Sequence, residues 1–213
     1  MYIPTSFSET DQQVLSGLIA KYPLGLLVTA DTSGLLASPI PFLCRESGAR
    51  SVLVAHMAKA NPHWKDLIDL KECLVVFQGA QNYITPDWYP SKSITHKVVP
   101  TWNYEVVQVR GVPTVIESAT WLREQVSQMT GTMEQERATP WKIEDAPADY
   151  LDKQLKAIVG LEIEITDIKG KWKMSQNRAP EDAAGVVQGL SDLEDPHANP
   201  EMATIVAARM LKT

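Results

Sequence analysis

The feature that most restricts the fold of this chain is a succession of strand-length apolar segments joined at hairpin spacing. Residues 24–30 form an apolar run of strand length, residues 31–34 have turn composition, and residues 35–43 read as the returning strand. Residues 161–168 alternate strictly between apolar and polar side chains, which is typical of a half-buried strand. Six or so such strands, with helices at the ends, predict a barrel or an α+β fold rather than a doubly wound sheet.

The other elements follow from the same patterns. Pro39 and Pro41 cannot donate ladder hydrogen bonds, so they mark a sheet edge or a place where another group approaches the backbone. We expect a first helix capped by Ser8, with Pro23 after its end. We expect further strands at 51–56, 73–78 and 104–116, a helix entered at Asn61-Pro62, and helices over 119–130 and 148–158.

The last 35 residues differ from the rest in charge and composition. The net charge is −6, of which residues 1–178 carry −2 and residues 179–213 carry −4. Residues 179–200 are rich in acid, proline and glycine, which predicts a partly ordered stretch before a short helix at 201–211. The chain therefore divides into a main domain at 1–178 and an acidic, partly helical C-terminal extension at 179–213.

Several functional classes lose support from the sequence. The chain has no P-loop, GxGxxG, HExxH or GxSxG motif, and its four histidines lack metal-ligand spacing, so no metal site is expected. Cys44 and Cys73 are expected to be buried free thiols. Lysine and arginine do not cluster as a DNA surface requires. No membrane span or signal peptide is recognised, so a cytoplasmic location is expected.

Three loop-rich segments carry candidate binding groups, and each also has a structural explanation. In residues 56–64, Lys59 and the amides near Asn61 form either a phosphate cradle or an ordinary strand-to-helix turn. Residues 83–92 and 99–104 hold a surplus of aromatic side chains and prolines, which suits a flat heteroaromatic ligand, a satellite core or a dimer contact. In residues 171–178, three cations with Ser175, Gln176 and Asn177 face either solvent or an anionic ligand.

Taken together and in this order, these segments resemble the PaiB-type family of FMN-binding negative transcriptional regulators. The matching stretches are Met1-Tyr2-Ile3-Pro4 with Phe7, His56-Met57-Ala58-Lys59-Ala60-Asn61-Pro62-His63-Trp64, Tyr83-Ile84-Thr85-Pro86 with Trp88-Tyr89, Val99-Pro100-Thr101-Trp102-Asn103-Tyr104, and Lys173-Met174-Ser175-Gln176-Asn177-Arg178. The resemblance covers about residues 1–190.

The resemblance implies an FMN-binding split β-barrel, mainly β with flanking helices, related to pyridoxamine-phosphate oxidases and flavin reductases. It also implies a homodimer that holds the flavin between its subunits, with the phosphate near Lys59. The aromatic loops and the 173–176 segment would line the isoalloxazine ring. The expected cofactor-binding residues are His56, Ala58, Lys59, Asn61, Trp88, Tyr89, Lys92, Trp102, Asn103, Lys173, Ser175 and Gln176.

Three functions remain open at this point. The first is a flavin-dependent transcriptional regulator or sensor, the second is a flavin-dependent oxidoreductase using the same pocket, and the third is a DNA-binding repressor without flavin. The sequence shows no catalytic acid–base pair, so it assigns no catalytic residue and leaves open whether the protein is an enzyme. DNA is a partner by the family's name, but the charge of −6 argues against a strong DNA surface.

Overall fold

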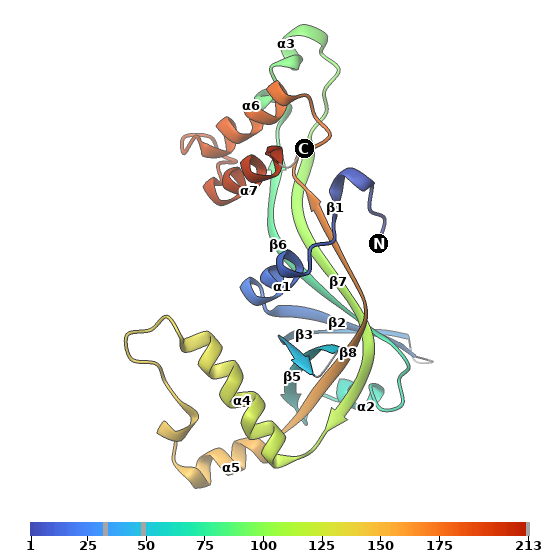
Figure 1. Cartoon of the computed structure of the whole chain (residues 1–213), viewed down its shortest axis with the longest axis vertical. Helices are drawn as coiled ribbons and strands as arrows, with labels where there is room; N and C mark the ends of the chain where they lie inside the picture. Colours follow the sequence, from blue (N-terminus) through green and yellow to red (C-terminus); the bar gives the residue numbers. More distant parts are fainter. Residues whose placement is uncertain (32–33, 48–49, 212–213) are drawn as a thin grey trace. The chain divides into compact units, whose positions relative to one another are not determined.

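A computed structural model describes residues 1–31, 34–47 and 50–211 of the chain (Figure 1). Its strands are β1 (Ser8–Glu9), β2 (Leu24–Asp31), β3 (Gly34–Pro41), β4 (Leu43–Ser47), β5 (Arg50–Ala58), β6 (Cys73–Ile84), β7 (Thr101–Ile116) and β8 (Ile158–Lys173). Its helices are α1 (Gln12–Lys21), α2 (His63–Asp66), α3 (Ser91–Thr95), α4 (Ala119–Glu134), α5 (Ala148–Lys156), α6 (Pro180–Ser191) and α7 (Pro200–Met210).

The strands form one sheet in the order β3-β2-β6-β7-β8-β5-β4, with β1 added beside β8. The pairs β2–β3, β2–β6, β4–β5 and β5–β8 are antiparallel. The chain divides into two compact units. We call residues 16–77 and 108–168 the central unit, and residues 1–15, 78–107 and those from 169 on the terminal unit.

The central unit holds the β2–β3 and β4–β5 hairpins and the helices α2, α4 and α5. Its core is built from the inward side chains of the strands, such as Leu27, Leu53 and Ile163, none of which has exposed surface. A second cluster forms where α4 and α5 pack together, around Leu122 and Leu155. Each of these helices has one apolar stripe, which is why both pack through one side.

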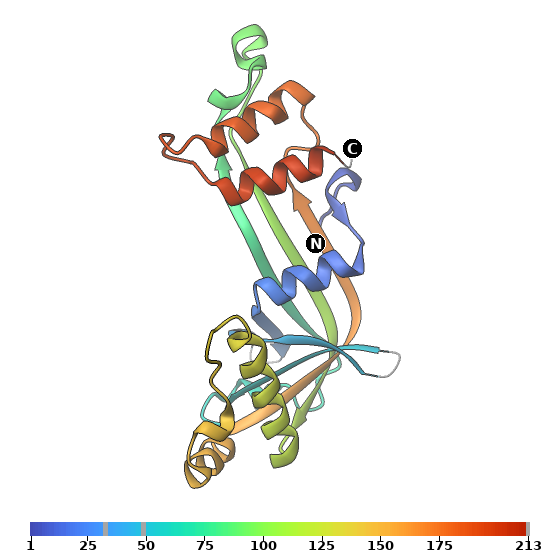
Figure 2. The same cartoon turned by 60° about the vertical axis from the view of Figure 1, so that its left-hand side comes forward.

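The terminal unit holds β1, α3, α6 and α7, and α6 and α7 lie side by side (Figure 2). Arg209 of α7 forms an ion pair with Glu9 of β1, with the charged atoms 2.5 Å apart and both side chains largely buried. Burial raises the pKa of Glu9, but hydrogen bonds from the Asp11 N–H and from Arg209 outweigh it and lower the pKa below its ordinary value. The last helix is thereby joined to the start of the chain.

Most of the predicted elements are confirmed, including the α+β class, the first hairpin and helices α4 and α5. Strand β3, which carries Pro39 and Pro41, is at one end of the strand order, as the prolines predict. Both cysteines are free, and Cys73 is buried, which raises its thiol pKa to about 12, while Cys44 is half-buried.

Three expectations need correction. Ser8 does not cap the first helix, because it belongs to β1; α1 starts at Gln12, and the Asp11 carboxylate accepts from the Gln13 N–H. The returning strand ends at Pro41, and a separate strand, β4, follows it. Residues 180–191 are not a partly ordered stretch but the helix α6, which begins with Pro180 at its first position.

Candidate functional site

The twelve expected cofactor-binding residues belong to both units, and each set is described by itself. His56, Ala58, Lys59 and Asn61 lie together in the central unit, at the end of β5 and in the loop before α2. The other eight belong to the terminal unit. They are Trp88, Tyr89, Lys92, Trp102, Asn103, Lys173, Ser175 and Gln176.

The backbone of Lys59 is held on both sides. Its N–H donates to the Ala157 carbonyl (2.8 Å), and its own carbonyl accepts from the Trp64 indole N–H (3.0 Å). The ammonium group is partly exposed and lies 3.4 Å from the Glu117 carboxylate. An exposed pair of this kind contributes little to stability. The loop therefore has a fixed position while the Lys59 charge stays accessible.

The amides near Asn61 already have partners within the loop. The Asn61 N–H donates to the Ala58 carbonyl (3.0 Å), and the Asn61 side-chain oxygen accepts from the His63 N–H (3.1 Å). Pro62 has no N–H, and α2 is only four residues long. The anion-binding capacity of this loop consequently depends on the Lys59 ammonium group rather than on the helix terminus.

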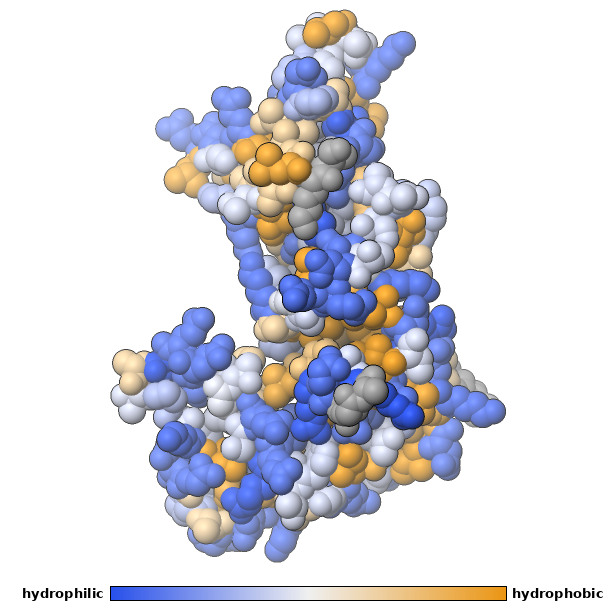
Figure 3. All heavy atoms as spheres, in the orientation of Figure 1, coloured by the Kyte–Doolittle hydropathy of each residue, from blue (hydrophilic) through white to orange (hydrophobic). Residues whose placement is uncertain are grey.

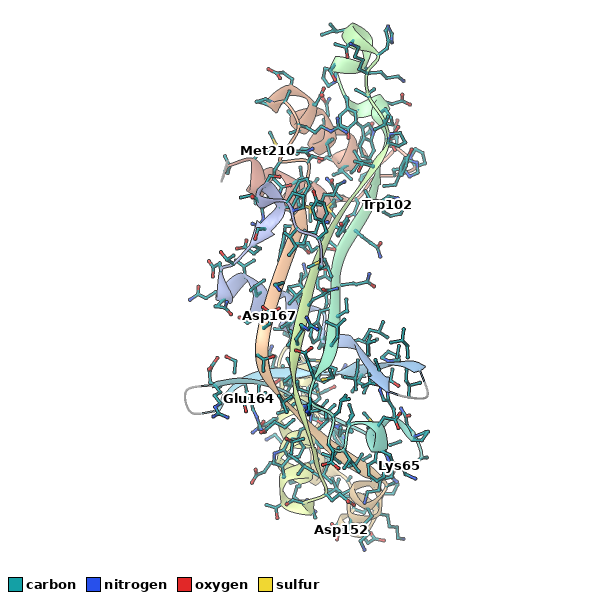
Figure 4. All side chains as sticks on the ribbon, turned by 90° about the vertical axis from the view of Figure 1, so that its right-hand side faces the viewer. Lys65, Trp102, Asp152, Glu164, Asp167 and Met210 are labelled. Atoms are coloured by element: carbon teal, nitrogen blue, oxygen red, sulfur yellow. The ribbon has the colours of Figure 1, made fainter. Side chains whose placement is uncertain are left out.

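A groove of about 400 Å³ opens beside Lys59, between the loop and helices α4 and α5. It adds two cations that the sequence reasoning missed, Arg123 and Lys156, and two carboxylates, Glu117 and Asp152. Arg123 and Asp152 form an exposed ion pair at 2.9 Å. Figure 3 shows the surface over α4 and α5 as mostly hydrophilic, and Figure 4 labels Asp152 on α5. Lys59 is over sixty residues from Arg123, so no spacing rule connects them.

His56 is fixed by a residue that the sequence did not single out. Its Nδ1 donates to the side-chain oxygen of Gln125 on α4, at 2.7 Å. An amide oxygen can only accept a hydrogen bond, so Nδ1 carries a proton in this contact. Gln125 is fully buried, and its side-chain nitrogen has no hydrogen-bond partner among the described residues.

His63, the eighth residue of the segment 56–64, lies inside the central unit with no exposed surface. Its Nε2 is 2.9 Å from the Thr29 hydroxyl, and its Nδ1 is 2.8 Å from the Ser38 hydroxyl. A neutral ring donates to one hydroxyl and accepts from the other. His63 thus joins α2, and through it the Lys59 loop, to β2 and β3.

We expect His63 to make stability depend on pH. Burial lowers its pKa below the ordinary value of about 6.5, against an opposing effect of Asp66. The unfolded chain therefore binds the proton more readily, and the free energy of unfolding falls as pH drops below about 6.5. Urea unfolding of the wild type and His63→Gln from pH 7.5 to 5.5 measures this. The variant should be less stable at pH 7.5 by about 1–3 kcal/mol, with a flatter pH dependence.

His96→Asn provides the control for this pH series. His96 is an exposed histidine in a left-handed backbone conformation that asparagine also adopts. This variant should keep the wild-type slope. Equal slopes for the wild type and His63→Gln would show that another group causes the pH dependence.

In the terminal unit, Trp88 lies against helix α6. Its indole covers Gly189, its N–H donates to the Asp195 carboxylate (2.9 Å), and its backbone carbonyl approaches Gly185. Tyr89 is buried beneath Arg178, whose guanidinium carbon is 4.7 Å from the ring centroid. The two side chains are thereby integrated into the packing of the unit.

A hollow of about 580 Å³ opens between this loop and α6. Its charged groups are mainly acidic, since Lys92 is paired with Asp87 and the hollow also contains Asp192 and Asp195. Hydrogen bonds from the His197 N–H and the Trp88 indole lower the pKa of Asp195 and keep it ionised. A phosphate group is therefore better matched by the Lys59 groove than by this hollow.

The 173–176 segment uses its polar groups within the unit. Asn103 and Ser175 are buried and hydrogen-bond to each other (3.1 and 3.2 Å), and the Gln176 side chain bonds to the backbone of Trp172 and Met174. Lys173 donates to the Thr101 hydroxyl and the Trp102 carbonyl. Burial, with Arg178 and Lys171 nearby, lowers the pKa of Lys173. These contacts fix the ends of β7 and β8.

Trp102 differs from its neighbours because half of its surface is exposed. It lies near the start of β7 (Figure 4) and meets Tyr83 edge to face, with ring centroids 6.1 Å apart. Tyr83 in turn contacts His197. Among the expected lining residues described here, Trp102 offers the largest free aromatic surface to a ligand or partner.

The comparison with known families agrees with these features. Residues 1–167 match the family model described as "Putative FMN-binding domain". The chain belongs to this FMN-binding family. A relative from Bacillus subtilis (strain 168), "Protease synthase and sporulation protein PAI 2", is 30% identical over 212 residues, spanning all of this chain and 99% of the relative. The PaiB resemblance seen in the sequence is thus confirmed, and FMN is the cofactor of the family.

Two solved structures share the fold. The FAD and heme binding protein from Mycobacterium smegmatis has a TM-score of 0.60 at 18% identity, covering 83% of this chain and 78% of that one. The flavocytochrome Anf3 from Azotobacter vinelandii has a TM-score of 0.58 at 15% identity, covering 84% and 75%. The predicted split β-barrel with flanking helices is confirmed.

Within the described ranges, no helix has the length and apolar character needed to cross a membrane. The same residues contain no group of three or more histidine, cysteine, aspartate or glutamate side chains arranged to hold a metal ion.

Proposed function

We propose that this protein is an FMN-binding homodimer with a regulatory, sensing role, and that the Lys59 groove receives the flavin phosphate. The observation that carries the proposal is the arrangement around Lys59. Its backbone is bonded at both the N–H and the carbonyl, while its ammonium group faces a groove that also contains Arg123 and Lys156. A preformed loop loses little conformational freedom on binding.

The groove fits a phosphate by charge. Its three cations exceed its two carboxylates, and the ion pairs that they form are exposed and weak. A dianionic phosphate accepts charge-assisted hydrogen bonds from all three cations and can replace the carboxylates as their partner. When bound, FMN supplies the redox chemistry. The residues of this chain position the cofactor, with His56 hydrogen-bonded to Gln125.

The isoalloxazine ring needs flat apolar contact and hydrogen-bonding groups along its pyrimidine edge. We assign the main flat contact to Trp102, and Trp88, Tyr89 and Asn103 remain the other proposed lining residues. Lys173, Ser175 and Gln176 remain the proposed polar contacts, contributed by the partner subunit. Most polar atoms of these three residues already form hydrogen bonds within the terminal unit, so their replacement would also disturb the fold. Replacement of the half-exposed Trp102 therefore tests the assignment most directly.

We expect Trp102→Ala to weaken FMN binding while the protein remains a dimer. The variant loses the buried apolar area of the indole and also its stacking on the flat ligand. Stacking of an aromatic pair contributes about 0.5–1.5 kcal/mol in addition to the free energy of burial. Flavin fluorescence titration, combined with light scattering on the same samples, measures both quantities. Trp141→Ala is the control, because Trp141 is similarly exposed but belongs to the central unit. A monomeric Trp102→Ala would instead identify Trp102 as a dimer contact.

The regulatory part rests on the full-length relative from Bacillus subtilis, whose name refers to protease synthesis and sporulation. The net charge of −6 opposes tight binding to DNA by this chain alone. We therefore propose that the flavin, rather than a DNA surface, is the primary ligand. An oxidoreductase using the same pocket is the alternative that the experiment must separate.

The test is an absorbance spectrum of the purified protein, followed by FMN titration and an assay for NAD(P)H oxidation. The proposal expects flavin bands and FMN binding with saturable, 1:1 stoichiometry per chain, without steady turnover of NAD(P)H. Sustained turnover would establish the oxidoreductase instead. Failure to bind added FMN would remove the proposal altogether.

A further inference from the structure

The strand β2 has an apolar sequence on both of its faces. Residues 24–30 read Leu-Gly-Leu-Leu-Val-Thr-Ala, with no charged residue at alternate positions. In an antiparallel sheet with one solvated face, apolar and polar side chains normally alternate, whereas a continuous apolar run is typical of a strand covered on both sides. The sequence thus predicts a cover for each face of β2.

Among the described residues, the structure covers only one of these two faces. Leu27 and Thr29 point into the core and are buried, and α2 reaches the same face through the hydrogen bond between His63 and Thr29. Leu24 and Leu26 point the other way, and 62% and 41% of their surfaces are exposed.

The neighbouring strands extend this exposed face. Leu24 is paired with Pro41 of β3, Leu26 with Pro39, Val28 with Ala37, and Ala30 with Leu35. On the other side, Leu26 is paired with Val76 of β6, and Val28 with Leu74. The ten residues of this surface, which we call the β2 outer face, are Leu24, Leu26, Val28, Ala30, Leu35, Ala37, Pro39, Pro41, Leu74 and Val76.

All ten residues of the β2 outer face are apolar, and none is buried. Singly exposed apolar side chains are normal on a protein surface, but a contiguous apolar patch usually marks an interaction site. Figures 1 and 2 show β2 and β3 as neighbouring strands of one hairpin. The β2 outer face is therefore a continuous surface built by hydrogen-bonded strands.

The edge of this surface is closed to strand addition. β3 is at the end of the strand order, where a free edge would otherwise accept another strand. Pro39 and Pro41 remove two backbone donors from β3. A partner must therefore pack onto the side chains of the sheet, as in a sheet-on-sheet interface, rather than extend the sheet.

We propose that the β2 outer face is the surface on which a second copy of this chain docks, sheet against sheet across a two-fold axis. This assignment rests on the homodimer of the proposed function and names its contact surface. In a two-fold dimer the same patch occurs on both subunits, so it must be compatible with itself. An uncharged apolar face meets this condition, because no like charges are brought together.

The size and composition of the patch agree with this occupant. A standard interface has about 20–30 residues a side, with an apolar centre and a polar rim. The ten apolar residues supply the centre. Charged residues occur beside it, since Glu72 and Arg110 form an exposed ion pair next to the β6 segment. An anionic membrane is a poorer match, because the chain carries a net charge of −6 and the patch contains no cation.

The experiment measures the dimer dissociation constant by analytical ultracentrifugation for full-length wild type and the double variant Leu24→Lys/Leu26→Lys. Four lysines would be buried in the dimer, so the dissociation constant should rise by at least about 100-fold. Leu35→Lys is a second variant. Leu35 is 80% exposed in the subunit and is the second residue of β3, so its replacement should leave the subunit fold intact and also weaken the dimer.

Leu193→Lys is the matched control, because Leu193 is 78% exposed but lies in the terminal unit, outside the β2 outer face. It should dimerise like the wild type. The proposal is overturned if both face variants dimerise as tightly as the wild type. It is also overturned if the wild type is monomeric at tens of micromolar, or if wild type but not the variants sediments with neutral or anionic lipid vesicles.

Flavin titration of the same samples separates this inference from the cofactor assignment. If the wild type binds FMN and the face variants dimerise as tightly as the wild type, only the docking face is contradicted. A dimer that responds to the face variants but never binds FMN would contradict only the cofactor assignment.

Discussion

Replacing Gly185 of α6 with alanine is expected to destabilise the terminal unit by about 1–3 kcal/mol, as overpacking of a closely packed site generally does. A Cβ atom at Gly185 would lie 2.0 Å from the carbonyl oxygen of Trp88. Because that oxygen belongs to the backbone, no side-chain rotation can relieve the contact. Urea unfolding of the variant, followed by circular dichroism, measures the loss.

Gly131→Ala is the control with the opposite expected sign. Gly131 lies in α4, and a Cβ atom there has no neighbour within 4 Å. The helix should gain about 0.5–1 kcal/mol from the higher helix propensity of alanine. If Gly185→Ala also stabilises the protein, then α6 is not packed against the Trp88 loop as described.

A pair of double variants identifies the atoms responsible. A Cβ atom at Gly189 would lie 2.4 Å from the indole of Trp88, whereas at Gly185 it meets the backbone. Trp88→Ala removes the indole but keeps the backbone. The cost of Gly189→Ala should therefore largely disappear in the Trp88→Ala background, while the cost of Gly185→Ala should persist.

These two glycines explain why the C-terminal stretch is misread from sequence. Glycine lowers helix propensity, and acid, proline and glycine together are typical of irregular structure. In α6 the two glycines leave room for Trp88, which lies about one hundred residues earlier in the chain and packs against them. Asp182 likewise accepts from both the N–H and the hydroxyl of Ser91. A local pattern contains no information about such distant partners, so the division at residue 178 remains a prediction.

The elements that the sequence predicts well are those with a local cause. The alternation at 161–168 marks the middle of β8, although the strand itself runs from Ile158 to Lys173 because its ends pair with other strands. Pro39 and Pro41 mark the edge strand for a reason contained in each residue. The hairpin of β2 and β3 follows from one apolar run, one turn and a second run.

The candidate site was predictable only in part, for the same reason. Lys59 is recognisable as a cation in a loop between a strand and a helix. Arg123 and Lys156 join it only because α4 and α5 lie beside that loop. The sequence around His63 does not show whether this side chain is exposed or is buried and hydrogen-bonded to two hydroxyl groups. Tertiary contacts therefore decide which polar residues bind and which hold the fold together.

Lys59→Ala is expected to weaken FMN binding by about 10- to 100-fold without unfolding the protein. A hydrogen bond to a charged group contributes about 1.5–3 kcal/mol, and each 1.4 kcal/mol corresponds to a tenfold change in affinity. The Lys59 side chain is partly exposed and forms an exposed ion pair with Glu117, so its loss from the fold costs little. Flavin fluorescence titration of wild type and variant measures the change.

Two further variants distinguish a direct phosphate contact from a general effect of charge. Lys65→Ala removes one positive charge from α2, six residues away and outside the groove, so it should change FMN affinity little. Glu117→Gln removes the carboxylate that competes for the Lys59 ammonium group, so it should tighten binding, and more strongly at low salt because screening is then weaker. If Lys65→Ala weakens FMN binding as much as Lys59→Ala does, Lys59 acts only through its net charge. If Lys59→Ala leaves the FMN affinity unchanged, the phosphate binds elsewhere.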